Sequence, residues 1–406
     1  MAVDAGSLSR APRAARALAA GVGAGVRPRL DAVDLLRGVV MALMLLDHTR
    51  DFFSATGFNP RDVHAPALFL TRWVTHFCAP VFIFLAGASA FLYGARGRST
   101  AEVSRFLFTR GLFLIVLELT AVRLAWSFSV APDFLVFQVI WALGISMVAL
   151  ALLVHLPRTV VATLALAVIA GHNLLDGIKA QDFGDAASMW KFLHESGPIL
   201  IGQTRAIVAY PLLPWIAVMA AGWACGPVLL RDDASRRRWL LAAGLGLLAL
   251  FAVLRAINGY GDPVPWAQQA SFLATVLAFI NAEKYPPSLA YLAMTLGPAL
   301  LALAAFRNSP PVALKPLLDI GRVPLLFYVA HLFVLHALAV LWAEATIGDS
   351  AWLFGGLGIG SKPQNYGASL PMVYAIALAT LFLLHPLCRK FAALKQRRKD
   401  GWLSYL

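Results

Sequence analysis

Charged side chains are scarce in this sequence, at 14% of its 406 residues, whereas a soluble domain has about a quarter. Hydrophobic residues make up 60%, and the mean hydropathy is +0.72. This excludes an ordinary soluble domain, which would show alternating polar and apolar patterns rather than long apolar runs. The composition is typical of a polytopic helical membrane protein, whose first partner is the lipid bilayer.

Cysteine is also rare. The three residues of this type, Cys78, Cys225 and Cys388, lie in or beside apolar runs and have no paired spacing, which excludes a disulfide framework and a cysteine-based zinc site. The net charge of +13 is not accompanied by a nucleic-acid recognition motif, so we predict no nucleic-acid partner and relate the basic residues to orientation in the bilayer. A glycine-rich phosphate loop is absent as well.

The apolar runs predict the fold class. Each is close to the ~20 residues that a helix needs to cross a bilayer, so we expect an all-α bundle of about ten transmembrane helices. A further run at 271–282 is too short to cross unaided. The ten runs lie at 35–48, 67–94, 106–126, 134–154, 159–175, 209–230, 239–257, 288–306, 323–344 and 370–391.

The two ends of the sequence differ from its middle. Residues 1–28 are rich in alanine, arginine and glycine and lack a clean cleavage signal, so they are expected to form a disordered basic tail. The membrane domain is expected at 29–394, followed by a basic cytoplasmic tail at 395–406. Of the 34 basic residues, 22 lie in segments on the side of the amino terminus and 10 on the other side. This bias predicts that both termini are cytoplasmic.

The first apolar run, RLDAVDLLRGVVMALMLLDHTRDFF, places polar groups at both of its ends. Asp34, Arg37 and His48 share one face of the predicted helix, with Arg37 and His48 about 16 Å apart along its axis. One interpretation is that these groups only anchor the helix at the two lipid headgroup regions. The alternative is function, because polar groups near the hydrocarbon are costly and mark functional sites by default.

Histidines recur around the predicted outer end of this run, at His48, His64 and His76. Zinc sites use tighter ligand pairs, so we predict no metal. Acid–base catalysis by one histidine, oriented by a carboxylate such as Asp47, Asp51 or Asp62, fits these residue types better. A solvated loop residue is the alternative for His64. The ninth run carries His331 and His336 in apolar surroundings, with Arg322 at its inner edge. These histidines are costly to leave without partners, although many such groups only hold helices together.

Several segments in series resemble a known family. The Arg-x10-His spacing of Arg37 and His48 resembles the opening motif of the acyltransferase-3 family, whose members acylate bacterial surface glycans. The order of VDLLRGVVMALMLLDH, a loop histidine, APVFIFLAG, YPLLPWIAVMAAGWACG, YPPSLAYLAMTLGP, GRVPLLFYVAHLFVLH and WLSYL is similar to the heparan-α-glucosaminide N-acetyltransferase-like family. This resemblance covers roughly residues 29–406.

The resemblance implies a transmembrane acyltransferase-like bundle in the bacterial inner membrane. An acetyl or other short acyl group would pass from cytoplasmic acetyl-CoA, or another acyl-CoA, to a sugar amine or hydroxyl of a glycan or amino sugar outside. The family's loop histidine corresponds to His64 here, and the eukaryotic enzyme has asparagine where this chain has His48. Catalysis is therefore expected at His48, His64 and Asp47, with both imidazoles reaching one acceptor. The expected substrate-binding residues are Asp34, Arg37, His76, Arg322 and His331.

A transporter or flippase is the alternative function. Many spans, charged residues within them and proline-interrupted helices also describe carriers. The two halves of the sequence show no convincing repeat, which favours the acyltransferase. The sequence does not determine whether the protein forms a homo-oligomer.

Overall fold

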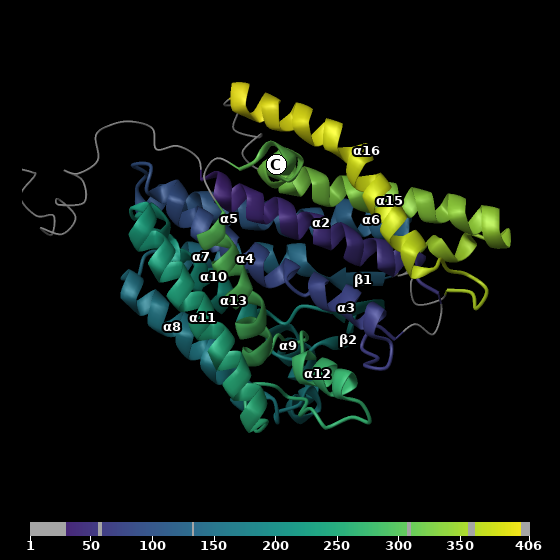
Figure 1. Cartoon of the computed structure of the whole chain (residues 1–406), viewed down its shortest axis with the longest axis horizontal. Coiled ribbons are helices and arrows are strands. Elements are labelled where there is room, and N and C mark those ends of the chain that lie inside the picture. Colours follow the sequence, from purple (N-terminus) through teal and green to yellow (C-terminus); the bar gives the residue numbers. More distant parts are fainter. Residues whose placement is uncertain (1–29, 56–58, 132–133, 307–309, 356–361, 399–406) are drawn as a thin grey trace, which may run out of the picture. The chain divides into compact units, whose positions relative to one another are not determined.

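The computed structural model describes residues 30–55, 59–131, 134–306, 310–355 and 362–398. Within them the chain is mostly helical (Figure 1), and α-helix is present in all ten segments predicted to span the membrane. The predicted tail at 1–28 lies outside the described residues. The longer helices are α2 (Asp31–Phe53), α4 (Cys78–Gly94), α5 (Thr100–Leu117), α7 (Val139–Leu153), α8 (Arg158–Gly171), α10 (Leu212–Cys225), α11 (Asp233–Ile257), α13 (Leu289–Ala305), α15 (Pro324–Ile347) and α16 (Leu370–Arg397).

Six helical stretches of the described residues are long and apolar enough to cross a membrane. They are 66–94, formed by α3 (Pro66–Thr75) and α4, together with 158–175, 212–230, 233–257, 324–347 and 370–397. Helices α7 and α13 are apolar but shorter. Helix α2 has 23 residues and holds six charged side chains, more than the six apolar stretches tolerate. The chain is therefore a polytopic membrane protein, and a total of about ten spans stays a prediction.

Polar residues in the connections begin several helices. Ser99 accepts a hydrogen bond from the backbone N–H of Glu102 at the start of α5, and the Glu102 carboxylate accepts one from the Ser99 backbone. Asp232 and Ser288 cap α11 and α13 by one hydrogen bond each, which their side chains accept from the backbone N–H groups of Ser235 and Tyr291. Such caps satisfy N–H groups that have no partner within the helix. Helices α5 and α11 therefore begin at Thr100 and Asp233, six residues before the apolar runs at 106–126 and 239–257.

Glycines allow the helices to approach closely. Gly38 of α2 faces the backbone of α14 (Lys315–Arg322), where a Cβ atom would lie 1.8 Å from the Leu317 carbonyl oxygen. Gly321 of α14 faces back, with a Cβ position 1.8 Å from the Asp34 carbonyl oxygen. Similar contacts join Gly87 of α4 to α10 and Gly111 of α5 to α7. Small residues at helix contacts are the usual solution in membranes, where apolar burial between helices contributes little.

Helix α2 is central to the bundle, with α15 and α16 lying along it (Figure 1). Its neighbours are α3, α4, α13, α14, α15 and α16. The polypeptide leaves helical geometry at Val323 (φ −132°, ψ 51°), between α14 and α15. Because of this break, α14 packs on the first half of α2 while α15 turns toward its second half. That arrangement brings α15 to the residues that follow Met44.

A three-stranded sheet corrects the all-α prediction. It contains β1 (Phe134–Phe137), β2 (Gly197–Ile201) and β3 (Thr204–Val208) in the order β1-β3-β2. Strands β2 and β3 form an antiparallel hairpin in which Ile201 pairs with Thr204, and Gly202 has the positive φ (61°) that such a tight turn requires. Strand β1 pairs with β3 in parallel, so the helix predicted from residue 134 begins only at Val139.

The short run at 271–282 contains α12 (Phe272–Ile280), a nine-residue helix too short to cross a bilayer. At the other boundary, α16 continues to Arg397, three residues past the predicted end of the membrane domain at 394. The division into a membrane domain and two tails stays a prediction.

Candidate active site

Two histidines from distant parts of the chain meet at the second half of α2. His48 Nδ1 lies 2.7 Å from Nε2 of His331 on α15, and the two rings stack with 8° between their planes. His331 Nδ1 lies 2.8 Å from the carbonyl oxygen of Phe327. Both imidazoles are buried, at 8% and 0% exposure. The structure thus gives His48 a partner 283 residues away.

The carbonyl of Phe327 determines how protons are arranged in this pair. A carbonyl only accepts hydrogen bonds, so Nδ1 of His331 must carry the proton. In the neutral ring Nε2 of His331 is then an acceptor, and Nδ1–H of His48 donates to it. This leaves Nε2 of His48 with its lone pair, and no hydrogen bond joins that atom to a described residue. The pair therefore presents a base with a fixed tautomer.

Aromatic side chains surround His48. Trp126 lies edge-on to its ring at 5.1 Å between centroids, and Tyr328 does so at 6.0 Å. Trp126 belongs to α6 (Arg123–Ser127), which follows the π-helical turn Glu118–Val122. The indole nitrogen of Trp126 and the hydroxyl of Tyr328 are buried and complete no hydrogen bond with the described residues. The site thus holds two N–H or O–H donors beside the base, which the sequence did not indicate.

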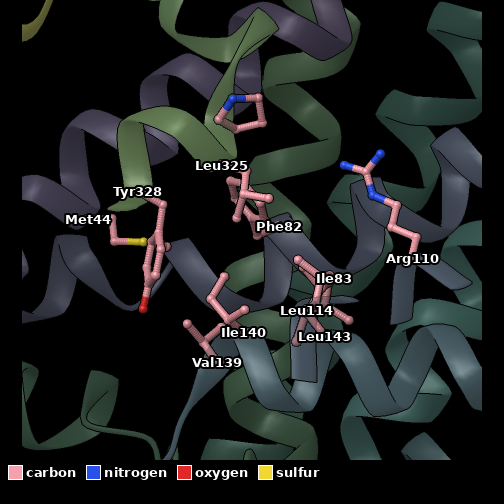
Figure 2. A pocket seen from close by; sticks show the side chains of 11 residues that line it. Met44, Phe82, Ile83, Arg110, Leu114, Val139, Ile140, Leu143, Leu325 and Tyr328 are labelled. Carbon is pink, nitrogen blue, oxygen red and sulfur yellow. The ribbon is translucent and has the colours of Figure 1, made fainter. Parts of the chain in front are cut away.

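An apolar pocket lies next to the histidine pair. Figure 2 shows Met44 and Tyr328 on one side of it and the Arg110 guanidinium on the other. Met44 stands one helical turn before His48, and Tyr328 contacts the rings of His48 and His331. The cavity itself is about 40 Å³, smaller than the ~300–1,000 Å³ of a typical small-molecule site. Its remaining walls are Phe82, Ile83, Leu114, Val139, Ile140, Leu143, Pro324 and Leu325.

Asp47 faces away from the imidazole of His48. Its carboxylate accepts a hydrogen bond from the Thr75 hydroxyl at 2.8 Å and pairs with Arg50 at 2.6 Å. Arg50 also pairs with Asp51 at 3.0 Å. The group that orients His48 is therefore His331, whereas the sequence had suggested Asp47 for this role. Asp47 instead belongs to a charged network on the neighbouring face of α2.

Lys284, in the loop before α13, extends this network. The side chain is 6% exposed, and its ammonium lies 5.0 Å from the ring centre of Tyr285 and 5.8 Å from that of Tyr210. Burial alone lowers the pKa of Lys284, but Tyr210, Tyr285 and Asp47 outweigh burial and hold the pKa above its usual value. Lys284 therefore remains a cation beside Asp47. The sequence analysis missed it because a single lysine in a long loop forms no motif.

The other two predicted histidines do not join the pair. His64 is exposed, and only its backbone N–H is bonded, to the carboxylate of Asp62 at 2.8 Å. His76 is 2% exposed and lies edge-on to Tyr291, and both of its ring nitrogens are buried without hydrogen-bond partners among the described residues. It follows Thr75, the residue that bonds Asp47. His76 therefore lies near the charged network, whereas His64 lies at the surface.

The remaining predicted site residues gather at the start of α2. Arg37 pairs with Asp34 at 2.9 Å and donates to the hydroxyl of Ser89 on α4. Arg322 of α14 pairs with Asp31 at 3.0 Å. These residues are about three helical turns from His48, so they cannot act on the same atom as it does. In the structure they connect α2 to α4 and α14.

Within the described residues, the one group of three side chains suited to bind a metal ion is His172, Asp176 and His194. It lies apart from His48, so the prediction that no metal takes part at the histidine pair stays a prediction.

Comparison with known proteins relates this arrangement to a reaction. The chain matches the family described as "Heparan-alpha-glucosaminide N-acetyltransferase, catalytic" over residues 29–256, more than half of its length. No curated protein matches it significantly. The matched region includes His48, Arg110 and Trp126 but ends before His331, so the resemblance expected up to residue 406 is confirmed only to 256. Its extent is enough to conclude that this membrane protein belongs to the heparan-α-glucosaminide N-acetyltransferase catalytic family.

Proposed function

We propose that this protein is an integral membrane acyltransferase that moves an acetyl or other short acyl group from cytoplasmic acyl-CoA to a sugar amine or hydroxyl outside. Membership of an acetyltransferase family with an acetyl-CoA donor gives the reaction class. The observation that carries the proposal is the His48–His331 pair, whose neighbour Tyr328 lines an apolar pocket.

The proposed reaction needs one base and one site for negative charge. The acceptor oxygen or nitrogen forms a bond to the acyl carbon while Nε2 of His48 takes its proton. The carbon–sulfur bond then breaks, and the CoA thiolate leaves with that proton. Negative charge develops on the former carbonyl oxygen of the thioester in the tetrahedral intermediate, and buried hydrogen-bond donors stabilise it. The candidate donors beside His48 are Trp126 Nε1–H and Tyr328 O–H.

The pocket suits the acyl end of the donor. Its walls are almost entirely apolar, which matches the chemistry of an acyl group, while Arg110 supplies positive charge on the side opposite Tyr328. Pro324 at the start of α15 also lines the pocket, so the positive end of a 24-residue helix faces it. Arg37 and Arg322 remain proposed contacts for the CoA diphosphate at the cytoplasmic mouth.

A pocket-filling substitution tests the donor site. Leu143→Trp places a larger side chain into the pocket from α7 and is expected to raise KM for acetyl-CoA at least tenfold. Leu152→Trp is the matched control, because Leu152 lies on the same helix and is 73% exposed. The check is steady-state kinetics on both variants after gel filtration. A folded Leu143→Trp protein with unchanged KM would place the donor elsewhere.

The acceptor sugar is proposed to bind at the charged network beside His48. A sugar carries hydroxyl and amine groups, which bind carboxylates and cations, and Asp47, Arg50 and Lys284 supply both charges close to His48. His76 borders this network with two unpartnered ring nitrogens. His64 is proposed to meet the acceptor from the surface, as the family resemblance implies.

The proposed orientation in the membrane rests on the distribution of basic residues, with 22 on the side of the amino terminus and 10 on the other side. The side with more basic residues is expected to be cytoplasmic. In a cysteine-free background, Ala234→Cys is expected to react with a membrane-impermeant maleimide only from the cytoplasmic side. Asp185→Cys is expected to react only from outside, and both positions are exposed. Labelling of intact cells and of inverted vesicles distinguishes the sides. Reaction of both cysteines from one side would contradict the topology.

A transporter remains the second candidate, because the break at Val323 divides a helix as carriers often do. Purified protein incubated with radiolabelled acetyl-CoA and glucosamine separates the two functions. The acyltransferase produces labelled N-acetylglucosamine and free CoA. A transporter instead moves glucosamine into sealed vesicles without consuming acetyl-CoA.

A further inference from the structure

A second cluster of chemically active side chains lies away from the histidine pair. His172 follows α8, Asp176 stands one helical turn later, and His194 ends α9 (Ala187–Leu193). One ligand atom from each residue lies within 4.8 Å of the other two. Both histidines are 2% exposed. The 3₁₀ turn His172–Leu175 separates His172 from Asp176 and leaves their ligand atoms close together.

The distances suit a small cation. Zinc binds nitrogen and oxygen at ~2.0–2.1 Å, so two ligand atoms of a zinc tetrahedron are roughly 3.3 Å apart. Nδ1 of His172 and Nε2 of His194 are 3.3 Å apart, and Nε2 of His194 is 3.9 Å from a carboxylate oxygen of Asp176. Two imidazoles and a carboxylate form a three-residue ligand set with room for water as the fourth ligand.

The carboxylate is held in place by a neighbour. Asn173 donates from Nδ2 to the second oxygen of Asp176 at 2.8 Å, which leaves the first oxygen directed to His194. The amide oxygen of Asn173 accepts from the backbone N–H of Leu289, at the start of α13, at 2.9 Å. Residues that fix the ligands in this way are typical of metal sites and raise affinity.

We propose that His172, Asp176 and His194 bind one divalent transition-metal ion of the zinc type. The ion would close the segment 172–194 into a fixed loop. This loop leads directly into Ser196, whose hydroxyl donates to the carbonyl of Tyr285 at 3.3 Å. The ion would therefore support the loop that carries Lys284, without contact with the reacting groups at His48.

Metal analysis of the purified full-length protein tests the proposal. After removal of metal by EDTA and addition of Zn²⁺, the protein is expected to retain about one equivalent of zinc and to melt at a higher temperature. Cobalt substitution is expected to produce the intense visible bands of a four-coordinate site. Wild-type protein that is folded and binds no zinc or cobalt would overturn the proposal.

Variants locate the site. His194→Ala is expected to lose zinc retention, and Asp176→Asn, which preserves shape, is expected to weaken zinc binding at least tenfold. His155→Ala is the matched control, because His155 is an exposed histidine outside the cluster. Should His194→Ala not fold, Asp176→Asn still decides the matter. Equal zinc affinity in Asp176→Asn and wild type would overturn the assignment of these ligands.

Discussion

Replacing His48 with alanine is expected to lower acetyl transfer by roughly 10²- to 10⁴-fold, the usual contribution of a general base. The substitution removes the only ring nitrogen of the pair that has a free lone pair, since Nε2 of His331 is occupied by Nδ1–H of His48. The loss is expected in kcat, because the base acts in the transition state and contributes little to donor binding. Initial rates with radiolabelled acetyl-CoA measure it.

The partner histidine makes this prediction specific. His331→Ala is expected to lose less activity than His48→Ala, since it removes the orienting group but leaves the base. His331→Gln is expected to recover part of that loss, because its amide oxygen can accept from Nδ1–H of His48. The double variant is expected to be little worse than His48→Ala, because the pair acts as a unit.

Two controls accompany these variants. His385→Ala removes a half-buried histidine of α16 that bonds Asp319 at 3.4 Å, and it is expected to retain activity. Gel filtration excludes misfolding as the cause of any loss. Full activity in folded His48→Ala would remove the proposed mechanism.

Gly38→Ala is expected to have the largest effect on folding. Its Cβ atom would lie 1.8 Å from the carbonyl oxygen of Leu317 and 2.6 Å from the carbonyl carbon. Backbone atoms cannot rotate away as a flexible side chain can, so α2 and α14 would have to separate. Overpacking costs ~1–3 kcal/mol in ordinary cores, and a contact this short is expected to cost more. Separation would also displace α15 and with it His331.

Gly246→Ala is the matched control for this effect. Gly246 lies in α11 with no atom within 4 Å of its Cβ position, so alanine there is expected to be neutral or to stabilise the helix by ~0.5–1 kcal/mol. The measurements are the yield of monodisperse protein and its melting temperature. A Gly38→Ala protein with wild-type yield and melting temperature would show that the helices are less tightly packed than described.

Sequence patterns predicted the helices because each apolar run is close to the ~20 residues that a membrane-spanning helix needs. The same patterns identified His48, since a histidine at the end of a membrane helix is costly without a function. His331 was recognised as expensive for the same reason. The contact between His48 and His331 could not be predicted, because no local periodicity relates residues 283 positions apart.

Other parts of the site had weaker signals. Arg110 sits inside an apolar run, and only the packing of five helices makes it the charged side of a pocket. The sheet was missed because its strands have four or five residues, although Gly202 between Ile201 and Thr204 is a hairpin signal. Asp47 was predicted to orient the imidazole of His48 because the two residues are adjacent in the sequence. Adjacent residues of a helix point about 100° apart, and the Asp47 carboxylate binds Thr75 and Arg50 instead.

An assay in proteoliposomes tests whether the protein transfers an acyl group across the membrane to a sugar. Purified protein is reconstituted into liposomes that contain glucosamine, radiolabelled acetyl-CoA is added outside, and labelled N-acetylglucosamine is measured inside. We expect product within the vesicles only when the cytoplasmic face points outward, and a reduction of at least a hundredfold with His48→Ala. No transfer by wild-type protein in either orientation, with glucosamine or with a hydroxyl-bearing sugar, would contradict the account.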